Sequence, residues 1–292
     1  IINYMPELPE VEVVKKSLVK RILRKKIKKI RINNSSLRYK VNIKKINLLI
    51  NKKILNISRK SKYIIINFEN SYSLIIHLGM TGRFYFQDKN FLQKTSFYFN
   101  LNDNNNIHDH IIFSISNSLK LIYNDIRRFG FLIVKKTSFL EQIKCLKNLG
   151  PEPLSKDFNV SSFRIIKRNS IVIKNLLMNQ SFVSGLGNIY VNEILFKSKI
   201  HPEKPIKELG IKELKKIVKN TKYLLRKAIT LGGSSIRNFK NTGGRTGKFQ
   251  DNFKVYGREG KLCKTYNCKF KILRVMTNNR SSFYCPSCQK EH

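Results

Sequence analysis

The sequence predicts an α+β protein of several domains, with an antiparallel β-sandwich or barrel first, a helical region next and a four-cysteine tail last. Short apolar runs rich in Tyr and Phe, separated by clusters of Asn, Asp and Ser, fill about residues 54–134, which is typical of antiparallel strands. Helical periodicity returns over about residues 158–231. Four of the five cysteines form two close pairs near the C-terminus. The length of 292 residues suits two or three modest domains.

The charge of the chain indicates a polyanionic partner. Its 58 Lys+Arg residues against 18 Asp+Glu give a formal net charge of +40, and nucleic acid is the obvious polyanion. Part of the lysine excess reflects A/T-rich codons, which also favour Asn and Ile. No apolar run is long enough to span a bilayer, and the N-terminus lacks the pattern of an export signal. We therefore expect a cytoplasmic protein.

The stretch NYMPELPEVE, residues 3–12, is compatible with two interpretations. Pro9 and the acidic residues beside it are typical of a helix start, and the amphipathic pattern predicts a helix from Val11 to about Leu23. Carboxylates beside prolines also suit a catalytic N-terminus.

Two segments separate the later parts of the chain. NLGPEPLS, residues 148–155, is a turn-rich linker, and a Gly-rich basic segment begins at Gly232. Between them, one predicted helix carries an apolar face made of Val191, Ile194, Leu195 and Ser198.

The cysteine spacing predicts a metal site. Cys263 and Cys268 enclose four residues, and Cys285 and Cys288 enclose two. Two such pairs suit four thiolates around one structural zinc ion. Two disulfides are the alternative, but a reducing cytoplasm disfavours them. Cys145 stands apart, and we expect it in a hydrophobic core.

Three internal motifs are unremarkable singly and informative together. HLGMTGRF (77–84) predicts a tight turn with Met80 at its tip, and DIRRFG (125–130) places two arginines and a phenylalanine at a turn between strands. Apolar wedges and guanidinium groups suit an enzyme that extrudes a base from DNA. SGLGNIYVNEILF (184–196) leads two glycines into a helix N-terminus, which can hold a phosphate.

The ordered motifs MPELPEVE, HLGMTG, RRFG, LGPEPL, GLGNIY, VYGREG and the terminal cysteine pairs resemble those of bacterial formamidopyrimidine-DNA glycosylase, over essentially residues 5–290. The resemblance implies a β-sandwich domain, a helix–two-turn–helix domain and a zinc finger, with DNA in the cleft between them. It also implies a nucleoid-associated monomer that acts on double-stranded DNA containing oxidised purines or abasic sites. The expected activities are excision of 8-oxoguanine and formamidopyrimidines, followed by β,δ-elimination at the abasic site. The domain boundaries that we predict are 5–136 for the sandwich, 137–155 for a linker, 156–250 for the helical domain with a lesion-capping loop, and 254–292 for the zinc finger.

The resemblance also implies the roles of individual residues. After removal of the initiator Met, Pro6 matches the nucleophile and Glu7 the proton donor. Lys62 matches the lysine of β-elimination, and Arg280 the arginine of δ-elimination. Further positions match DNA contacts and the side chains that fill the space left by the extruded base: His108, Arg127, Arg128, Asn188, Met80 and Phe129.

The sequence departs from the family pattern at three places. Ile1 to Tyr4 precede Met5, and they would make the Pro6 nitrogen an amide, so we expect translation to start at Met5. A basic DNA-contacting position falls on Asn169, with Arg168 the nearest arginine. The capping loop, 234–249, carries Lys248 where an aromatic residue is common.

Two other functions are compatible with these motifs. An endonuclease VIII-type enzyme would prefer oxidised pyrimidines, although Leu8 and Phe129 favour the purine branch. A zinc-bearing DNA-binding protein without catalysis would explain the charge, the cysteines and a blocked Pro6.

Overall fold

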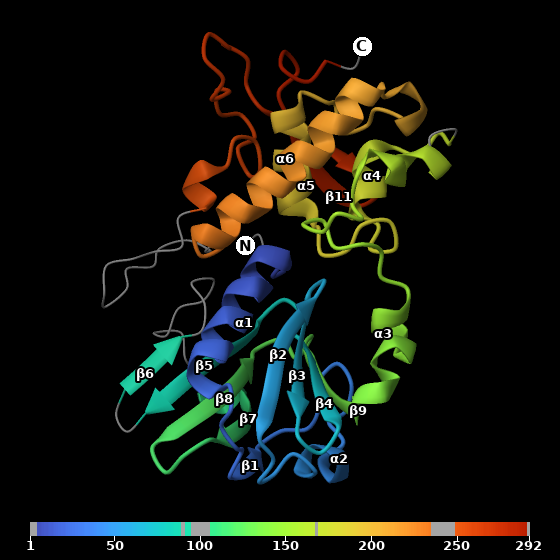
Figure 1. Ribbon diagram of the computed structural model, residues 1–292. Coiled ribbons are helices and arrows are strands. Elements are labelled where there is room, and N and C mark those ends of the chain that lie inside the picture. Colours follow the sequence, from blue (N-terminus) through green and yellow to red (C-terminus); the bar gives the residue numbers. More distant parts are fainter. Residues whose placement is uncertain (1–4, 89–90, 95–105, 167–168, 235–248, 291–292) are drawn as a thin grey trace. The chain divides into compact units, whose positions relative to one another are not determined.

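The computed structural model describes residues 5–88, 91–94, 106–166, 169–234 and 249–290 (Figure 1). The chain forms two compact units, Ile1–Lys147 with Leu231–Lys248, and Asn148–Thr230 with Phe249–His292. Each unit therefore combines two separate stretches of sequence. Among the described residues, no helix has both the length and the apolar character needed to cross a bilayer.

Helix α1, Leu8–Ile22, opens the first unit. Its apolar side chains recur at helical spacing, and Val11, Val14 and Leu18 are fully buried. The helix begins three residues earlier than predicted, because Glu7 is its N-cap in a capping box with Glu10.

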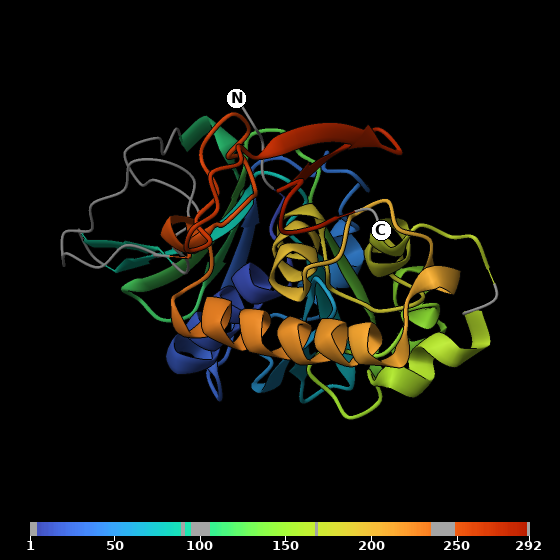
Figure 2. The ribbon, with the colours of Figure 1, turned by 90° about the horizontal axis from the view of Figure 1, so that it is seen from above.

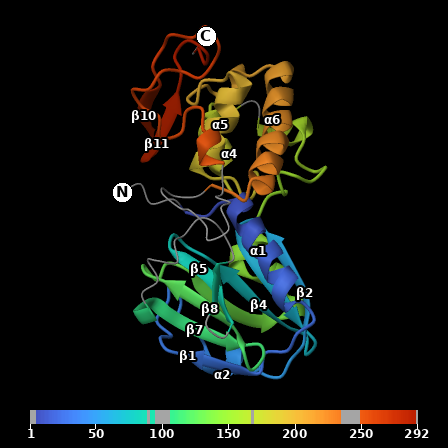
Figure 3. The same cartoon turned by 90° about the vertical axis from the view of Figure 1, so that its left-hand side faces the viewer.

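Two antiparallel sheets form the body of the first unit, so the sandwich is confirmed over the barrel (Figure 3). The five-stranded sheet has the order β1 (Lys29–Ile32), β7 (Asp109–Ser114), β8 (Leu119–Asp125), β5 (Gly82–Asp88), β6 (Phe91–Lys94). The four-stranded sheet has the order β2 (Ile54–Lys60), β3 (Tyr63–Phe68), β4 (Tyr72–His77), β9 (Phe131–Lys136). Two short helices, α2 (Ile43–Asn47) and α3 (Lys144–Lys147), and two 3-10 helices, Asn106–His108 and Thr137–Gln142, belong to the same unit.

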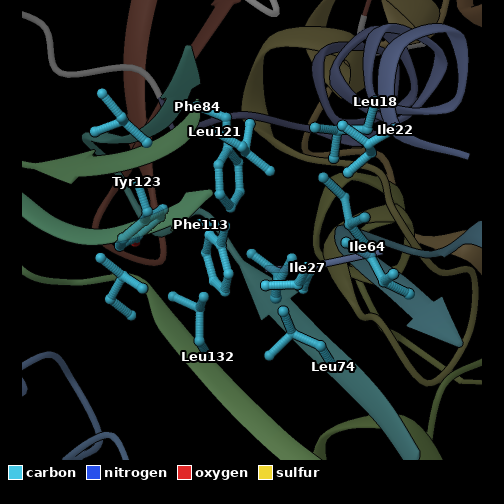
Figure 4. Close-up of a cluster of buried hydrophobic side chains, with 14 of the residues drawn as sticks. Leu18, Ile22, Ile27, Ile64, Leu74, Phe84, Phe113, Leu121, Tyr123 and Leu132 are labelled. Atoms are coloured by element: carbon cyan, nitrogen blue, oxygen red, sulfur yellow. The ribbon is translucent and has the colours of Figure 1, made fainter. Parts of the chain in front are cut away.

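The core lies between the two sheets and under α1 (Figure 4). Phe84, Phe113 and Leu121 come from the five-stranded sheet, whereas Ile64 and Leu74 come from the four-stranded sheet. Cys145 does not join this core. It lies half-buried on α3, and the expectation of a core cysteine was wrong.

The second unit is built on three helices, α4 (Ile173–Met178), α5 (Asn188–Ser198) and α6 (Ile211–Thr230). Figure 2 shows α6 as a long helix with α5 alongside it. The predicted apolar face of α5 is buried, but so are Asn192 and Glu193 on its other sides, so α5 is a central helix rather than an amphipathic surface helix. Three 3-10 helices complete the unit: Val160–Ile166, Ile206–Glu208 and Gln250–Asn252.

A β-hairpin made of β10 (Leu273–Thr277) and β11 (Arg280–Tyr284) closes the second unit. Its two turn residues, Asn278 and Asn279, both have positive φ, at 46° and 58°. Asparagine tolerates this conformation, which matches the twist of a hairpin. The turn sets Arg280 at the exposed start of β11.

Candidate nucleic-acid interface and metal site

The start of α1 holds two buried carboxylates, Glu7 and Glu10, close to Pro6. Pro6 is buried, and Glu7 and Glu10 are each 3% exposed. The Glu10 carboxylate accepts the Glu7 N–H at 3.0 Å and both the N–H and the hydroxyl of Ser234 at 2.8 Å. Gly233 lies close enough that a Cβ there would come 3.1 Å from Glu10 Oε1. Glu10 therefore ties the first residues of the helix to the beginning of the Gly-rich segment.

Lys62 lies in the β2–β3 turn and is 8% exposed. Arg59, on β2, pairs with Glu12 of α1 at 2.9 Å and donates to the Ser61 carbonyl at 2.9 Å. Because one guanidinium group contacts both α1 and the residue before Lys62, it fixes the turn against the helix that carries Pro6.

His77, at the end of β4, is the first residue of the HLGMTGRF motif, and the sequence analysis gave it no role. Its Nδ1 accepts the Gly79 N–H at 3.1 Å, and its ring stacks on Phe131 at 5.4 Å. Burial, with the Lys62 and Arg38 charges, lowers the pKa of His77 to about 4. The imidazole is therefore neutral at physiological pH and places an uncharged ring near Lys62.

The two turns predicted to carry wedge residues lie next to each other. Arg127 and Phe129 are exposed, and the Arg127 guanidinium carbon lies 4.5 Å from the centre of the Phe129 ring. The Arg127 N–H donates to the Thr81 hydroxyl at 2.9 Å, directly after the half-buried Met80. Arg128 is exposed and has a positive φ of 57°. The structure thus groups Met80, Arg127, Arg128 and Phe129.

A surface pocket of about 590 Å³ adjoins these turns and is lined by Ser36, Leu37, Arg38 and residues 127–129. Three guanidinium groups surround it, so its chemistry suits an anionic ligand. His108 lies half-buried at the end of the 3-10 helix before β7, outside this group of lining residues.

In the second unit, Asn188 and a buried lysine, Lys174, meet at the backbone carbonyl of Ser281, the residue after Arg280. The Ser281 carbonyl accepts Lys174 Nζ at 2.9 Å and Asn188 Nδ2 at 3.0 Å. Lys174 also donates to Ser282 Oγ at 2.6 Å. Asn188 is the first residue of α5, so its side chain lies at the positive end of the helix dipole. A helix N-terminus, an amide and two cationic groups are a suitable phosphate site.

Lys174 was missed by the sequence analysis. It is only 1% exposed, and burial, followed by the Arg280 charge, lowers its pKa to about 8. The available signal was a lone lysine inside the apolar run IVIKNLLM.

Asn169 is exposed, and its N–H donates to the Ile166 carbonyl at 3.0 Å. Arg168, Lys248 and most of the predicted capping loop fall outside the described residues.

Glu193, also missed, anchors the segment that precedes the cysteines. Its carboxylate is 3% exposed and accepts backbone N–H groups of Lys254, Val255 and Tyr256 at 2.9–3.0 Å. Burial raises the pKa of Glu193, and these hydrogen bonds oppose the shift.

The four cysteines predicted as metal ligands come together. Their sulfur atoms all lie within 4.8 Å of one another. Cys268 lies 3.6 Å from Cys285 and 3.8 Å from Cys288, and Cys263 lies 3.9 Å from Cys288. A disulfide needs sulfurs about 2.05 Å apart, so the disulfide alternative does not fit. A backbone hydrogen bond from Phe270 lowers the pKa of Cys268 to about 7. The group can hold a metal ion.

Thr265, in the wide first pair, lies against two of these sulfurs. Its hydroxyl is 3.4 Å from Cys263 Sγ and 3.5 Å from Cys288 Sγ, and its N–H donates to Cys263 Sγ at 3.4 Å. The longer first pair therefore supplies one backbone N–H donor to the group and places a hydroxyl within hydrogen-bond distance of two sulfurs.

Two sequence profiles match the chain, the formamidopyrimidine-DNA glycosylase N-terminal domain over residues 5–132 and the formamidopyrimidine-DNA glycosylase H2TH domain over residues 149–240. The chain belongs to the formamidopyrimidine-DNA glycosylase family. The family enzyme of Rickettsia canadensis is 42% identical over 288 residues, covering 98% of this chain and 99% of that protein. The enzyme of Rickettsia felis is 41% identical over 287 residues, covering 98% of each.

Solved structures of the family have the same fold. Lactococcus lactis Fpg, in a complex with DNA containing an abasic site, is similar with a TM-score of 0.84 and 35% identity, over 98% of this chain and all of the other. A variant of the same enzyme with DNA containing Fapy-dG gives the same TM-score, identity and coverage. The predicted β-sandwich, helix–two-turn–helix domain and four-cysteine group are those of this family.

Proposed function

We propose that this chain is a base-excision-repair glycosylase that removes oxidised purines from DNA and then cleaves the strand at the abasic site. The observation that carries this is a 42% identity extending over 98% of the chain to a formamidopyrimidine-DNA glycosylase. Solved relatives hold DNA with abasic and Fapy-dG sites. Its substrate is chromosomal DNA, so we propose the bacterial nucleoid as its location.

The chemistry begins with Pro6 as a free secondary amine. An N-terminal amine has a pKa of about 7.7, against about 10.4 for lysine, so more of it is neutral and nucleophilic at pH 7. The nitrogen lone pair bonds to C1′ of the sugar while the C1′–base bond breaks. The base leaves with the bonding electrons and gains a proton, and the amine nitrogen loses its own proton. Glu7 gives a proton to the ring oxygen as the sugar opens, and the product is an iminium between Pro6 and C1′.

Strand cleavage follows from the iminium, which accepts the electrons of elimination. We assign Lys62 to β-elimination and Arg280 to δ-elimination. Support for Lys62 is its burial on a turn fixed to α1 through Arg59. Support for Arg280 is its exposed position beside the Lys174 and Asn188 cluster.

DNA binding divides between the two units. We propose that Met80 and Phe129 fill the space of the extruded base and that Arg127 faces the orphaned base, whereas Arg128 and His108 contact the backbone. Asn188 is assigned to a phosphate. Either Asn169 or Arg168 makes the remaining helical-domain contact.

We propose zinc as the ion held by the four cysteines. A tetrahedron with zinc–sulfur bonds of about 2.3 Å has edges of about 3.8 Å, close to the sulfur separations of 3.6–3.9 Å. Four protein ligands leave no open position, so the ion would stabilise the fold around the β10–β11 hairpin.

Borohydride trapping on abasic DNA tests the mechanism. Protein started at Met5 and processed to Pro6 is expected to form a covalent adduct, whereas protein that retains residues 1–4 is expected to form none, because its Pro6 nitrogen is an amide. Mass spectrometry of the active protein should find Pro6 as the first residue. Adduct formation by the blocked form would contradict the assignment of Pro6, and absence of adducts from both forms would favour a binding protein. Excision of thymine glycol in preference to 8-oxoguanine would favour the endonuclease VIII type.

A further inference from the structure

The backbone of the Met80 turn lies directly against the backbone of the Arg127–Phe129 turn. Each links strands of different sheets, β4 to β5 and β8 to β9. A Cβ on Gly79 would lie 2.4 Å from the Phe129 carbonyl carbon, and one on Gly130 would lie 2.0 Å from the Tyr123 hydroxyl. Backbone of one turn therefore touches backbone of the other, with no room for a side chain between them.

A buried carboxylate joins the same two turns by hydrogen bonds. Asp125, fully buried, accepts the Thr81 hydroxyl on Oδ1. Its Oδ2 accepts the Gly130 N–H at 2.8 Å and the Tyr123 hydroxyl at 3.1 Å. The Thr81 hydroxyl accepts the Arg127 N–H at 2.9 Å. Thr81 thus both donates to Asp125 and accepts from the second turn.

The exposed side chains next to this hydrogen-bond network indicate what the network does. Phe129 is 43% exposed, with the Arg127 guanidinium over its ring, while Asp125 and Tyr123 are inaccessible. The part that would enter DNA is exposed, and the part that holds it in shape is buried.

We propose that Thr81 and Asp125 are positioning residues, which lock the two turns into one rigid wedge so that Met80 and Phe129 enter the duplex together. This rests on the proposed function, because it assigns those side chains to the duplex. Loss of the Thr81 hydroxyl would free the Arg127 backbone and let the two tips separate. Since a displacement of about 1 Å costs about 100-fold in a positioned reaction, even partial loosening is measurable.

The test compares Thr81→Val with Thr81→Ser in single-turnover excision of 8-oxoguanine from duplex DNA. A 2-aminopurine next to the orphaned base reports unstacking. We expect Thr81→Val to slow excision by at least about tenfold and to reduce the fluorescence rise, whereas Thr81→Ser stays within about threefold of the wild type. Trapping on an abasic site in single-stranded DNA, where no partner strand needs a wedge, should not change.

Thr221→Val is the matched control, because Thr221 is fully buried and its hydroxyl has no hydrogen-bond partner among the described residues. It should behave as wild type in both assays. Equal duplex excision by Thr81→Val and wild type would overturn the proposal, as would an equal loss on both substrates with a lowered melting temperature. If Thr81→Val does not fold, Thr81→Ala gives the same comparison. If the wild-type protein forms no trapped adduct with either DNA substrate, the proposed function itself is refuted.

Discussion

Single residues in the first unit are tuned by neighbours that lie far away in the sequence. Glu10, in the first turn of α1, accepts hydrogen bonds from Ser234, and His77 is held neutral by burial beside Lys62 and Arg38. Such groups make stability depend on pH in a direction that can be stated.

Below neutral pH, His77 should destabilise the fold. Its folded pKa of about 4 lies below the ordinary 6.5. As pH falls from about 6.5 to about 4, the His77 imidazole binds a proton in the unfolded chain but not in the folded chain. The free energy of unfolding therefore decreases over this range. Urea unfolding across this range should show a smaller decrease for His77→Asn, which keeps an acceptor for Gly79. Parallel curves for the two proteins would mean that His77 does not contribute.

At the scale of elements, the β10–β11 hairpin has few buried apolar side chains, and the four cysteines offer another source of stability. The β10–β11 hairpin exposes Leu273 and Met276, so few apolar side chains are left to hold it. A metal ion bound by four thiolates can supply folding free energy that such a small module lacks.

Removing the metal should therefore unfold the hairpin and displace Arg280. We expect chelation to abolish strand cleavage and lower the melting temperature.

Thr265→Val should weaken zinc affinity by about 10-fold, since partners of metal ligands typically contribute 10–100-fold, and Thr265→Ser should not. Competition with a chromogenic chelator measures this without activity. Tyr266→Ala, at a side chain 91% exposed in the same loop, is the control; equal zinc release by all variants would exclude a role for Thr265.

At the scale of the whole molecule, the net charge favours DNA binding, but it does not give the number of phosphate contacts. The net charge of +40 attracts any polyanion, whereas only cations that touch phosphates release counterions.

The salt dependence of binding should accordingly reflect contacts rather than net charge. We expect the slope of log affinity against log salt to be no steeper than about −10, which corresponds to about ten phosphate contacts. Arg280→Gln should make it shallower by about one. Fluorescence anisotropy from about 50 to about 200 mM salt provides the measurement. A slope several times steeper, or one unchanged by Arg280→Gln, would contradict these contacts.

Much of the fold was readable from local pattern. The apolar runs YIIINF, YSLIIHL, HIIFSI, LKLIY and FLIV became β3, β4, β7, β8 and β9, because buried strands of a sandwich appear as short apolar runs in the sequence. Four strands of the two sheets, β1, β2, β5 and β6, correspond to none of these runs. β1, KIRI, does alternate, but it is a four-residue edge strand in a Lys-rich stretch. β5, GRFYFQD, is buried along most of its length and does not alternate.

Local pattern was sufficient to predict the family, an antiparallel β domain, the helical domain and the four-cysteine group, because periodicity, glycine turns and ligand spacing are local properties. Only the tertiary structure showed that Glu10 reaches Ser234, that Lys174 and Asn188 share the Ser281 carbonyl, and that Asp125 joins two turns. These contacts join residues as far as 224 positions apart. Buried polar groups must find partners wherever the fold brings them, and no spacing along the chain specifies which partner that is.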